Sequence, residues 1–216
     1  MIGTSNKDIA TIKELIRPYK SFFLIGCGDC ATVCKTGGED QVKQFSGYLE
    51  KDGKKVNGWA VLEEACDLRL AKKLFREQES AINKSEAILV FSCGSGVQTV
   101  AEITEKKVLP MLDSLFAGGI ENLSNFRELC SVCGDCMLDI TAGICPVTRC
   151  PKGLVNGPCG GSNEGKCEEN TELDCAWYLI YSRLKQRDEI GGLRKLRKIK
   201  NNRANSKPHK IKLQKK

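Results

Sequence analysis

The stretch that decides the fold is SFFLIGCGDCATVC, residues 21–34. Its first seven residues form a short, almost wholly apolar run ending in Gly-Cys, which is typical of a buried parallel strand. A polar segment with helical spacing, EDQVKQFSGYLEKDG, follows at 39–53. A buried strand followed closely by an amphipathic helix begins a β–α unit. We therefore expect a parallel sheet.

The same alternation continues to about residue 115. Further strands are expected at 56–66, 86–93 and 107–115, with helices at 67–86 and 94–104 between them. Leu15 and Ile16 suggest one more helix before the first strand. Short apolar strands that alternate with helices favour an α/β fold with a doubly wound, Rossmann-like parallel sheet. We place this cluster-bearing domain at residues 1–122.

Residues 124–176 have a different composition. This segment holds eight cysteines, seven glycines and three prolines, and its helical periodicity is weak. Such a loop-rich segment buries too little apolar surface to fold alone, so we expect it to fold around metal. We place a cysteine-rich iron–sulfur or zinc module with a C-terminal helix at 123–182, and a basic tail at 183–216.

Composition narrows the chemistry. The chain has 216 residues, of which 13 are cysteine and only one, His209, is histidine. Metal sites built on several histidines, and triads with a histidine base, are therefore excluded. No apolar run approaches the length of a membrane span, and the N-terminus lacks a secretory signal, so we expect a cytoplasmic protein with reduced thiols. Thiolate iron–sulfur clusters or four-thiolate zinc sites remain.

The charge is uneven along the chain. Residues 183–216 hold 14 Lys and Arg against Asp188 and Glu189, a net charge of +12, while the remainder carries −5. The sequence from Arg194 onward has few apolar residues, so we expect it to be disordered or ordered by a partner. Nucleic-acid binding by this tail is less favoured, because the body is acidic and lacks interleaved basic and aromatic residues.

One group of cysteines lies at the ends of the predicted strands. Cys27, Cys30 and Cys34 form a C-x2-C-x3-C motif, and Cys66 and Cys93 end the next two strands. The carboxyl ends of parallel strands form the ligand crevice of an open α/β sheet. Five thiols thus converge where four would hold a [4Fe–4S] cluster. We favour Cys93 over Cys66 as the fourth ligand. A zinc site or inert cysteines are the alternatives.

The second group occupies the cysteine-rich module. It opens with a C-x2-C-x2-C run, and its members are Cys130, Cys133, Cys136, Cys145, Cys150, Cys159, Cys167 and Cys175. A C-x2-C-x2-C run followed by Cys-Pro resembles the bacterial ferredoxin signature, although the spacing before Cys145 is longer. We expect at least one [4Fe–4S] cluster here, with a structural zinc site as the main alternative.

The chain resembles the methylenetetrahydrofolate reductase C-terminal-domain family. The resemblance rests on GCGDCATVCKTGGE (26–39), SCGSGVQTV (92–100), GICPVTRCPKGLVNGPCGGSNEGKCE (143–168) and CAWYLIYSRLK (175–185). It extends from about Phe22 to Lys185 and is most specific at 143–168. Stand-alone members of this family are small iron–sulfur, MetV-type subunits of the acetogen-type reductase.

The resemblance implies function and partners. It implies an electron-transfer and scaffolding subunit, not itself catalytic, that serves a flavin-containing (β/α)8-barrel subunit in one-carbon, acetyl-CoA pathway metabolism. It implies an electron donor such as ferredoxin or a nicotinamide dehydrogenase subunit. The cysteines at 27, 30, 34, 66 and 93 match its N-terminal motif, and those at 130, 133, 136, 145, 150, 159 and 167 match its C-terminal one. The alternative function is a structural, zinc-binding assembly subunit without a redox role.

Overall fold

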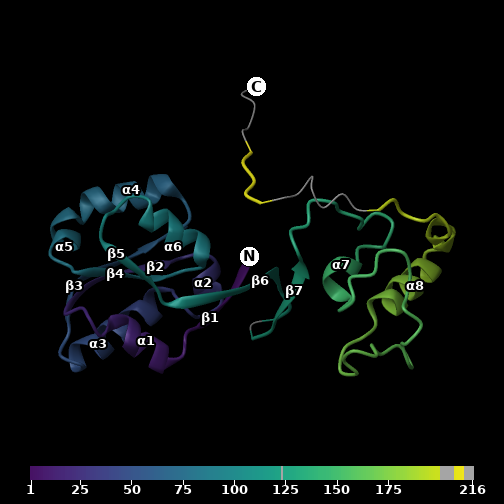
Figure 1. The fold of residues 1–216 in the computed structure, drawn as a ribbon, viewed down its shortest axis with the longest axis horizontal. Coiled ribbons are helices and arrows are strands. Elements are labelled where there is room, and N and C mark those ends of the chain that lie inside the picture. Colours follow the sequence, from purple (N-terminus) through teal and green to yellow (C-terminus); the bar gives the residue numbers. More distant parts are fainter. Residues whose placement is uncertain (123, 200–206, 212–216) are drawn as a thin grey trace. The chain divides into compact units, whose positions relative to one another are not determined.

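A computed structural model describes residues 1–122, 124–199 and 207–211 (Figure 1). The chain divides into two compact units, Met1–Gly118 and Gly119–Lys216. The first unit contains, in chain order, β1 (Ile2–Asn6), α1 (Ile9–Ile16), β2 (Ser21–Cys27), α2 (Cys30–Val33), α3 (Glu39–Lys51), β3 (Lys55–Leu62), α4 (Leu68–Glu77), α5 (Glu79–Asn83), β4 (Ala87–Phe91), α6 (Gly94–Ala101), β5 (Lys107–Pro110) and β6 (Leu112–Ile120), which runs past the unit boundary.

The first unit is built on a four-stranded parallel sheet with the strand order β3-β2-β4-β5. Strand β2 is central, with Cys27 beside Leu62 of β3 and Gly26 beside Phe91 of β4. The chain therefore adds a strand on one side of β2 and then crosses to the other side. The predicted doubly wound parallel sheet is confirmed.

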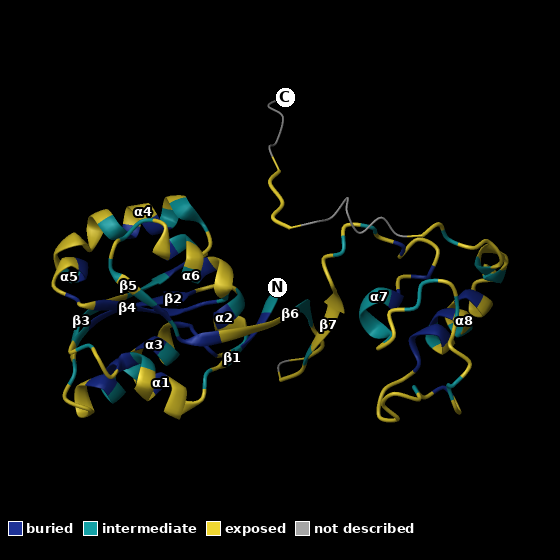
Figure 2. Ribbon diagram, viewed as in Figure 1, coloured by how far each residue is buried: buried dark blue, intermediate teal, exposed yellow. Residues whose placement is uncertain are grey.

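Helices cover both faces of this sheet, as Figure 1 shows. On one face Phe23, Ile25 and Val90 pack against apolar residues of α4, α5 and α6. On the other face Phe22 and Leu24 pack against α1 and α3. Figure 2 shows the strands β2 and β4 buried between the layers, while the outward helix faces are exposed. Within the described residues, no helix is long and apolar enough to cross a membrane.

Three details differ from the sequence prediction. Strand β1 was not expected, because IGTSN is short and lacks a clear alternating pattern. Residues 107–115 do not form one strand: β5 ends at Pro110, and β6 turns away to pair antiparallel with β1 in a sheet ordered β1-β6-β7. The expected helix over 67–86 is interrupted at Gln78, which separates α4 from α5.

The second unit has few regular elements. They are β7 (Phe126–Cys130), α7 (Pro146–Arg149), α8 (Ala176–Gln186) and a 3-10 helix, η1 (Ile190–Arg194). Its small core is centred on α8, where Trp177, Ile180 and Leu184 pack with Ile144. The C-terminal helix expected in this module is present as α8 and ends at Gln186. Of the basic segment, residues 200–206 and 212–216 lie outside the described residues.

Candidate metal centres

Three cysteines follow three adjacent strands of the parallel sheet. Cys27 is the last residue of β2, whereas Cys66 and Cys93 lie in the loops after β3 and β4, which end earlier than expected, at Leu62 and Phe91. All three thiols thus lie at the carboxyl edge, where the strand order reverses around β2. This is where open α/β sheets bind ligands.

The electrostatics of Cys66 show that these thiols are neighbours. Burial raises the pKa of the Cys66 thiol, and the nearby Cys93 and, more weakly, Cys27 raise it further. Like charges disfavour one another, so several thiolates at this edge need a cationic centre to coexist. Cys93 is also the N-cap of α6, where unpaired backbone N–H groups favour negative charge.

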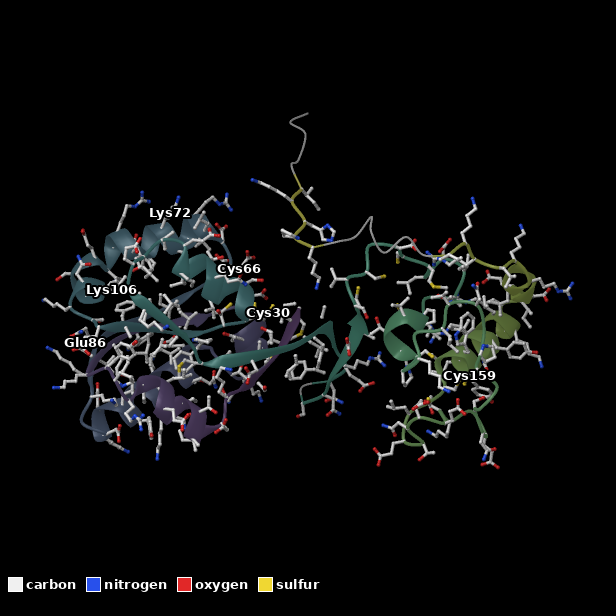
Figure 3. All side chains as sticks on the ribbon, viewed as in Figure 1. Cys30, Cys66, Lys72, Glu86, Lys106 and Cys159 are labelled. Atoms are coloured by element: carbon white, nitrogen blue, oxygen red, sulfur yellow. The ribbon has the colours of Figure 1, made fainter. Side chains whose placement is uncertain are left out.

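Cys30 and Cys34 lie on α2 and its C-cap, directly after β2. Both face the backbone of β1: the N–H of Ile2 donates to Cys30 Sγ at 3.4 Å, and Cys34 Sγ lies 3.8 Å from the Ile2 carbonyl oxygen. Burial raises the pKa of the Cys30 thiol, and the Ile2 hydrogen bond partly opposes that shift. In Figure 3, Cys30 and Cys66 lie at the same end of the sheet.

Strand β1 is therefore part of this site, although the sequence analysis did not identify it. A buried hydrogen bond of 2.7 Å between the hydroxyls of Thr4 and Thr36 joins β1 to the segment that follows Cys34. Sequence pattern alone carries little signal for this contact, because β1 is held by β6, whose residue Ala117 pairs with Ile2.

Two glycines let the cysteine-bearing segments approach closely. A Cβ on Gly37 would lie 2.2 Å from the carbonyl oxygen of Phe91, the last residue of β4. A Cβ on Gly96 would lie 2.4 Å from Ser92 Oγ and 2.9 Å from the Cβ of Ala65. The first approach brings the segment after Cys34 against the end of β4. The second brings α6 against the residues that precede Cys66 and Cys93.

In the second unit, four cysteines line one small cavity. Its volume is about 20 Å³, and its sulfur-bearing residues are Cys150, Cys159, Cys167 and Cys175. Two backbone hydrogen bonds hold these loop segments together. The N–H of Cys167 donates to Leu173 O at 3.0 Å, and the N–H of Cys175 donates to Gly165 O at 2.8 Å. Cys175 was expected in this group but was not among the predicted ligands, which ended at Cys167.

Charged side chains surround Cys159. Its thiol lies 3.1 Å from a carboxylate oxygen of Glu168, and Lys152 forms ion pairs with Glu168 and Glu169. Lys152 also donates hydrogen bonds to both carboxylates, and these bonds raise its pKa above the ordinary range. The bond to Glu168 contributes most. Lys152 thus stays cationic beside the four-cysteine cavity.

The remaining cysteines of the second unit lie around β7 and α7. Cys130 ends β7 and accepts a hydrogen bond from the N–H of Val132 at 3.3 Å, while Cys145 is the N-cap of α7. A hydroxyl–hydroxyl contact of 2.8 Å between Ser131 and Thr148 joins the two segments. Cys133 and Cys136 follow on the loop after β7, the second of them exposed.

The thiols fit metal in chemical type and number. None of the thirteen cysteines forms a disulfide bond. Within the described residues, no three Cys, His, Asp or Glu side chains stand close enough to bind a single metal ion without moving. A four-iron cluster is larger than one ion and holds its thiolates farther apart. The five thiols of the first unit are ligands of the chemical type that such a cluster requires.

Comparison with known proteins gives one informative match. No curated protein matches the chain. Among solved structures, a LacI family transcriptional regulator from Arthrobacter sp. FB24, in complex with lactose, is 16% identical with a TM-score of 0.31. That match covers 44% of this chain and 33% of the regulator, so the chain spans about a third of its length. It carries no argument about fold or function.

The informative match is to a family model. Residues 109–203 match the family described as methylene-tetrahydrofolate reductase C terminal. This segment contains every cysteine of the second unit. The match supports the resemblance over this part of the chain, and residues 22–108 lie outside it. The stretch from residue 109 to residue 203 is therefore similar to the methylene-tetrahydrofolate reductase C-terminal family.

Proposed function

We propose that this chain is an iron–sulfur electron-transfer and scaffolding subunit of a methylenetetrahydrofolate reductase complex. The observation that carries the proposal is the gathering of Cys27, Cys66 and Cys93 at the switch point of the parallel sheet. Cys30 and Cys34 join them from α2. The family match at 109–203 supports the choice of complex.

In this proposal the first unit holds a [4Fe–4S] cluster through Cys27, Cys30, Cys34 and Cys93. Such a cluster takes up and releases single electrons, with the change in charge spread over several irons and sulfides. The chain's own residues tune the site: the Ile2 N–H stabilises negative charge on Cys30, and the α6 N-terminus does the same at Cys93. Their role is to position and stabilise thiolates; no acid–base step is assigned to them.

The second unit carries two groups of four cysteines. We assign a second [4Fe–4S] cluster to Cys130, Cys133, Cys136 and Cys145. We assign a structural zinc ion to the cavity lined by Cys150, Cys159, Cys167 and Cys175, because four thiolates are a ligand set that structural zinc takes. The proposed partners are a flavin-containing barrel subunit that reduces methylenetetrahydrofolate, and an electron donor such as ferredoxin or a nicotinamide dehydrogenase subunit.

The test is metal analysis of the full chain, purified with its partner in the absence of oxygen. We expect about eight iron, about eight acid-labile sulfide and about one zinc per chain, with EPR signals of reduced clusters after dithionite. Zinc without iron would refute the electron-transfer role. It would leave the alternative function, an assembly subunit, which predicts unchanged partner turnover with an artificial electron donor when this chain is made metal-free.

Single substitutions separate the groups. Cys93→Ala is expected to remove about four iron per chain and leave zinc in place, whereas Cys175→Ala is expected to remove zinc and leave iron. Cys66→Ala is the matched control, since Cys66 is the fifth thiol at the same edge. Retention of full iron by Cys93→Ala together with its loss in Cys66→Ala would reverse the choice of fourth ligand.

A further inference from the structure

One space in the second unit, open to solvent on one side, is lined largely by apolar and aromatic side chains. It is a cavity of about 350 Å³. Its walls come from helix α8, from the loop 155–158 and from the segment 192–197. No cysteine lines it. This volume falls within the range of pockets that take small-molecule ligands.

Three aromatic side chains form one wall of this cavity. Trp177, Tyr178 and Tyr181 lie at helical spacings of three and four, which place Tyr181 beside each of the other two on α8. Trp177 is 5% exposed and its indole N–H donates to Leu154 O at 2.9 Å. The two tyrosines are 52% and 47% exposed, a large aromatic area left to solvent.

The backbone fixes the position of these rings. Gly165 has a φ of +81°, and a Cβ there would lie 2.9 Å from a ring carbon of Tyr178. The ring therefore rests directly on a backbone position that only glycine can supply without strain. Because Trp177 is held by a hydrogen bond and Tyr178 by this close packing, the aromatic wall is preformed.

The opposite wall is a segment held down by polar contacts. The N–H of Arg197 donates to Asn156 Oδ1 at 2.8 Å, and Asn156 Nδ2 donates to Arg197 O at 3.4 Å. The guanidinium of Arg197 forms an ion pair with Asp135. These contacts tie the chain after η1 to the loop 155–158 and close the cavity on that side.

The charge at the cavity is positive. Its lining includes Lys195 and Arg197 and no carboxylate. Asp135 offsets the charge of Arg197. Lys195 has no ion pair within the described part of the chain, so its ammonium group remains available at the rim. The lining therefore combines stacking surface with one uncompensated positive charge.

We propose that this cavity binds a planar aromatic molecule that carries an anionic group. The ring stacks on Tyr178 and Tyr181, and most of the binding free energy comes from covering their exposed aromatic surface. The anion lies toward Lys195. Trp177 and Pro158 also line the four-cysteine cavity, so the bound ring lies beside it. The inference does not depend on which metal, if any, the cysteines hold.

The test uses three probes that separate ring from charge. Flavin mononucleotide supplies a planar ring with a phosphate, riboflavin supplies the same ring without it, and inorganic phosphate supplies the anion alone. Flavin fluorescence is titrated with the full-length chain. We expect saturable binding of flavin mononucleotide to one site, roughly twofold to fivefold weaker binding of riboflavin, and no competition by phosphate at equal concentration.

Variants locate the site. Tyr181→Leu is expected to weaken binding of both flavins at least about tenfold, since it removes a stacking face. Lys195→Gln is expected to bring the affinity for flavin mononucleotide down to that for riboflavin. Trp59→Leu is the matched control, because Trp59 is an exposed aromatic residue of β3 in the first unit, and it is expected to bind as the unmodified chain does.

Three results would overturn the proposal. One is the absence of saturable binding of flavin mononucleotide. Another is unchanged binding by Tyr181→Leu with a melting temperature equal to that of the unmodified chain. The third is an equal loss of binding in Trp59→Leu. Tyr178→Leu provides a second test at the same wall if Tyr181→Leu fails to fold, and unchanged binding by it would count against the proposal in the same way.

Discussion

The close approach of Gly37 to β4 leads to a sharp prediction for Gly37→Ala. The carbonyl oxygen of Gly37 accepts the N–H of Cys27 at 3.0 Å, so this residue joins the segment after α2 to the end of β2. An alanine Cβ at this position would lie 2.2 Å from Phe91 O and 2.9 Å from the Phe91 carbonyl carbon. Both are backbone atoms of a central strand and cannot rotate away.

The magnitude follows from the overlap. Ordinary contact begins at 3.4 Å, so the backbone must separate by about 1 Å at this point. Overpacking of this kind costs about 1–3 kcal/mol, and the rigidity of β4 places this site at the upper end. With a cost of about 3 kcal/mol and a urea m-value of about 1–3 kcal/mol/M, we expect the midpoint of unfolding to fall by about 1–3 M.

The assay is urea unfolding followed by far-UV circular dichroism, with iron content measured in parallel. Gly47→Ala is the matched control, because it makes the same chemical change in α3 and its Cβ meets no atom within 4 Å. That variant is expected to stabilise the chain by about 0.5–1 kcal/mol, since alanine favours the helix. Equal midpoints for Gly37→Ala and the unmodified chain would refute the reasoning from steric contact.

Three further predictions concern the cysteine site, the pH dependence and the aromatic cavity. Ile2→Pro removes the N–H that donates to Cys30 Sγ; a redox titration monitored by EPR should show a lower reduction potential for the proposed cluster, and an unchanged potential would exclude the hydrogen bond as a tuning contact. Hydrogen bonds from the Arg69 side chain, and then from its backbone N–H, lower the pKa of Asp67 from 3.8 to about 2. Because the folded pKa lies below the ordinary value, the stabilisation is complete above about pH 4 and is lost as the pH falls through about 2. Asp67→Asn should therefore flatten urea midpoints plotted over that interval, and an unaltered slope would contradict the assignment. Gly165→Ala forces a side chain into a left-handed backbone conformation and against the Tyr178 ring; it should cost about 1–2 kcal/mol and weaken flavin mononucleotide binding, as measured by urea unfolding and fluorescence titration, and unchanged affinity would show that Gly165 does not position the Tyr178 ring for binding.

Much of the first unit can be predicted from local sequence. The runs that became β2 and β4 are apolar because both faces of a parallel sheet are covered by helices, and this requirement is visible without coordinates. The cysteines that follow these strands could be assigned to one edge for the same reason, since parallel strands share a carboxyl end. The doubly wound fold and the convergence at that edge both follow from pattern.

Contacts between distant segments were decided only by the tertiary structure. Strand β1 contacts Cys30 through the N–H of Ile2, and its position depends on its pairing with β6, which comes more than 100 residues later in the sequence. Backbone hydrogen bonds hold that pairing, and they leave little trace in side-chain pattern. Pairing with β1 is also the reason why residues 107–115 form two strands, β5 and β6, in place of one.

The second unit shows the same limit most clearly. Its loops have no periodicity from which the neighbours of a cysteine can be predicted. Cys175 lies beside the same cavity as Cys150, Cys159 and Cys167 because the chain turns at several glycines with positive φ. The aromatic cavity also depends on a segment that folds back onto the loop at Asn156. The sequence determines which residues can bind a metal or a ligand. The tertiary structure determines which of them lie close together, because loop geometry depends on contacts between residues far apart in the sequence.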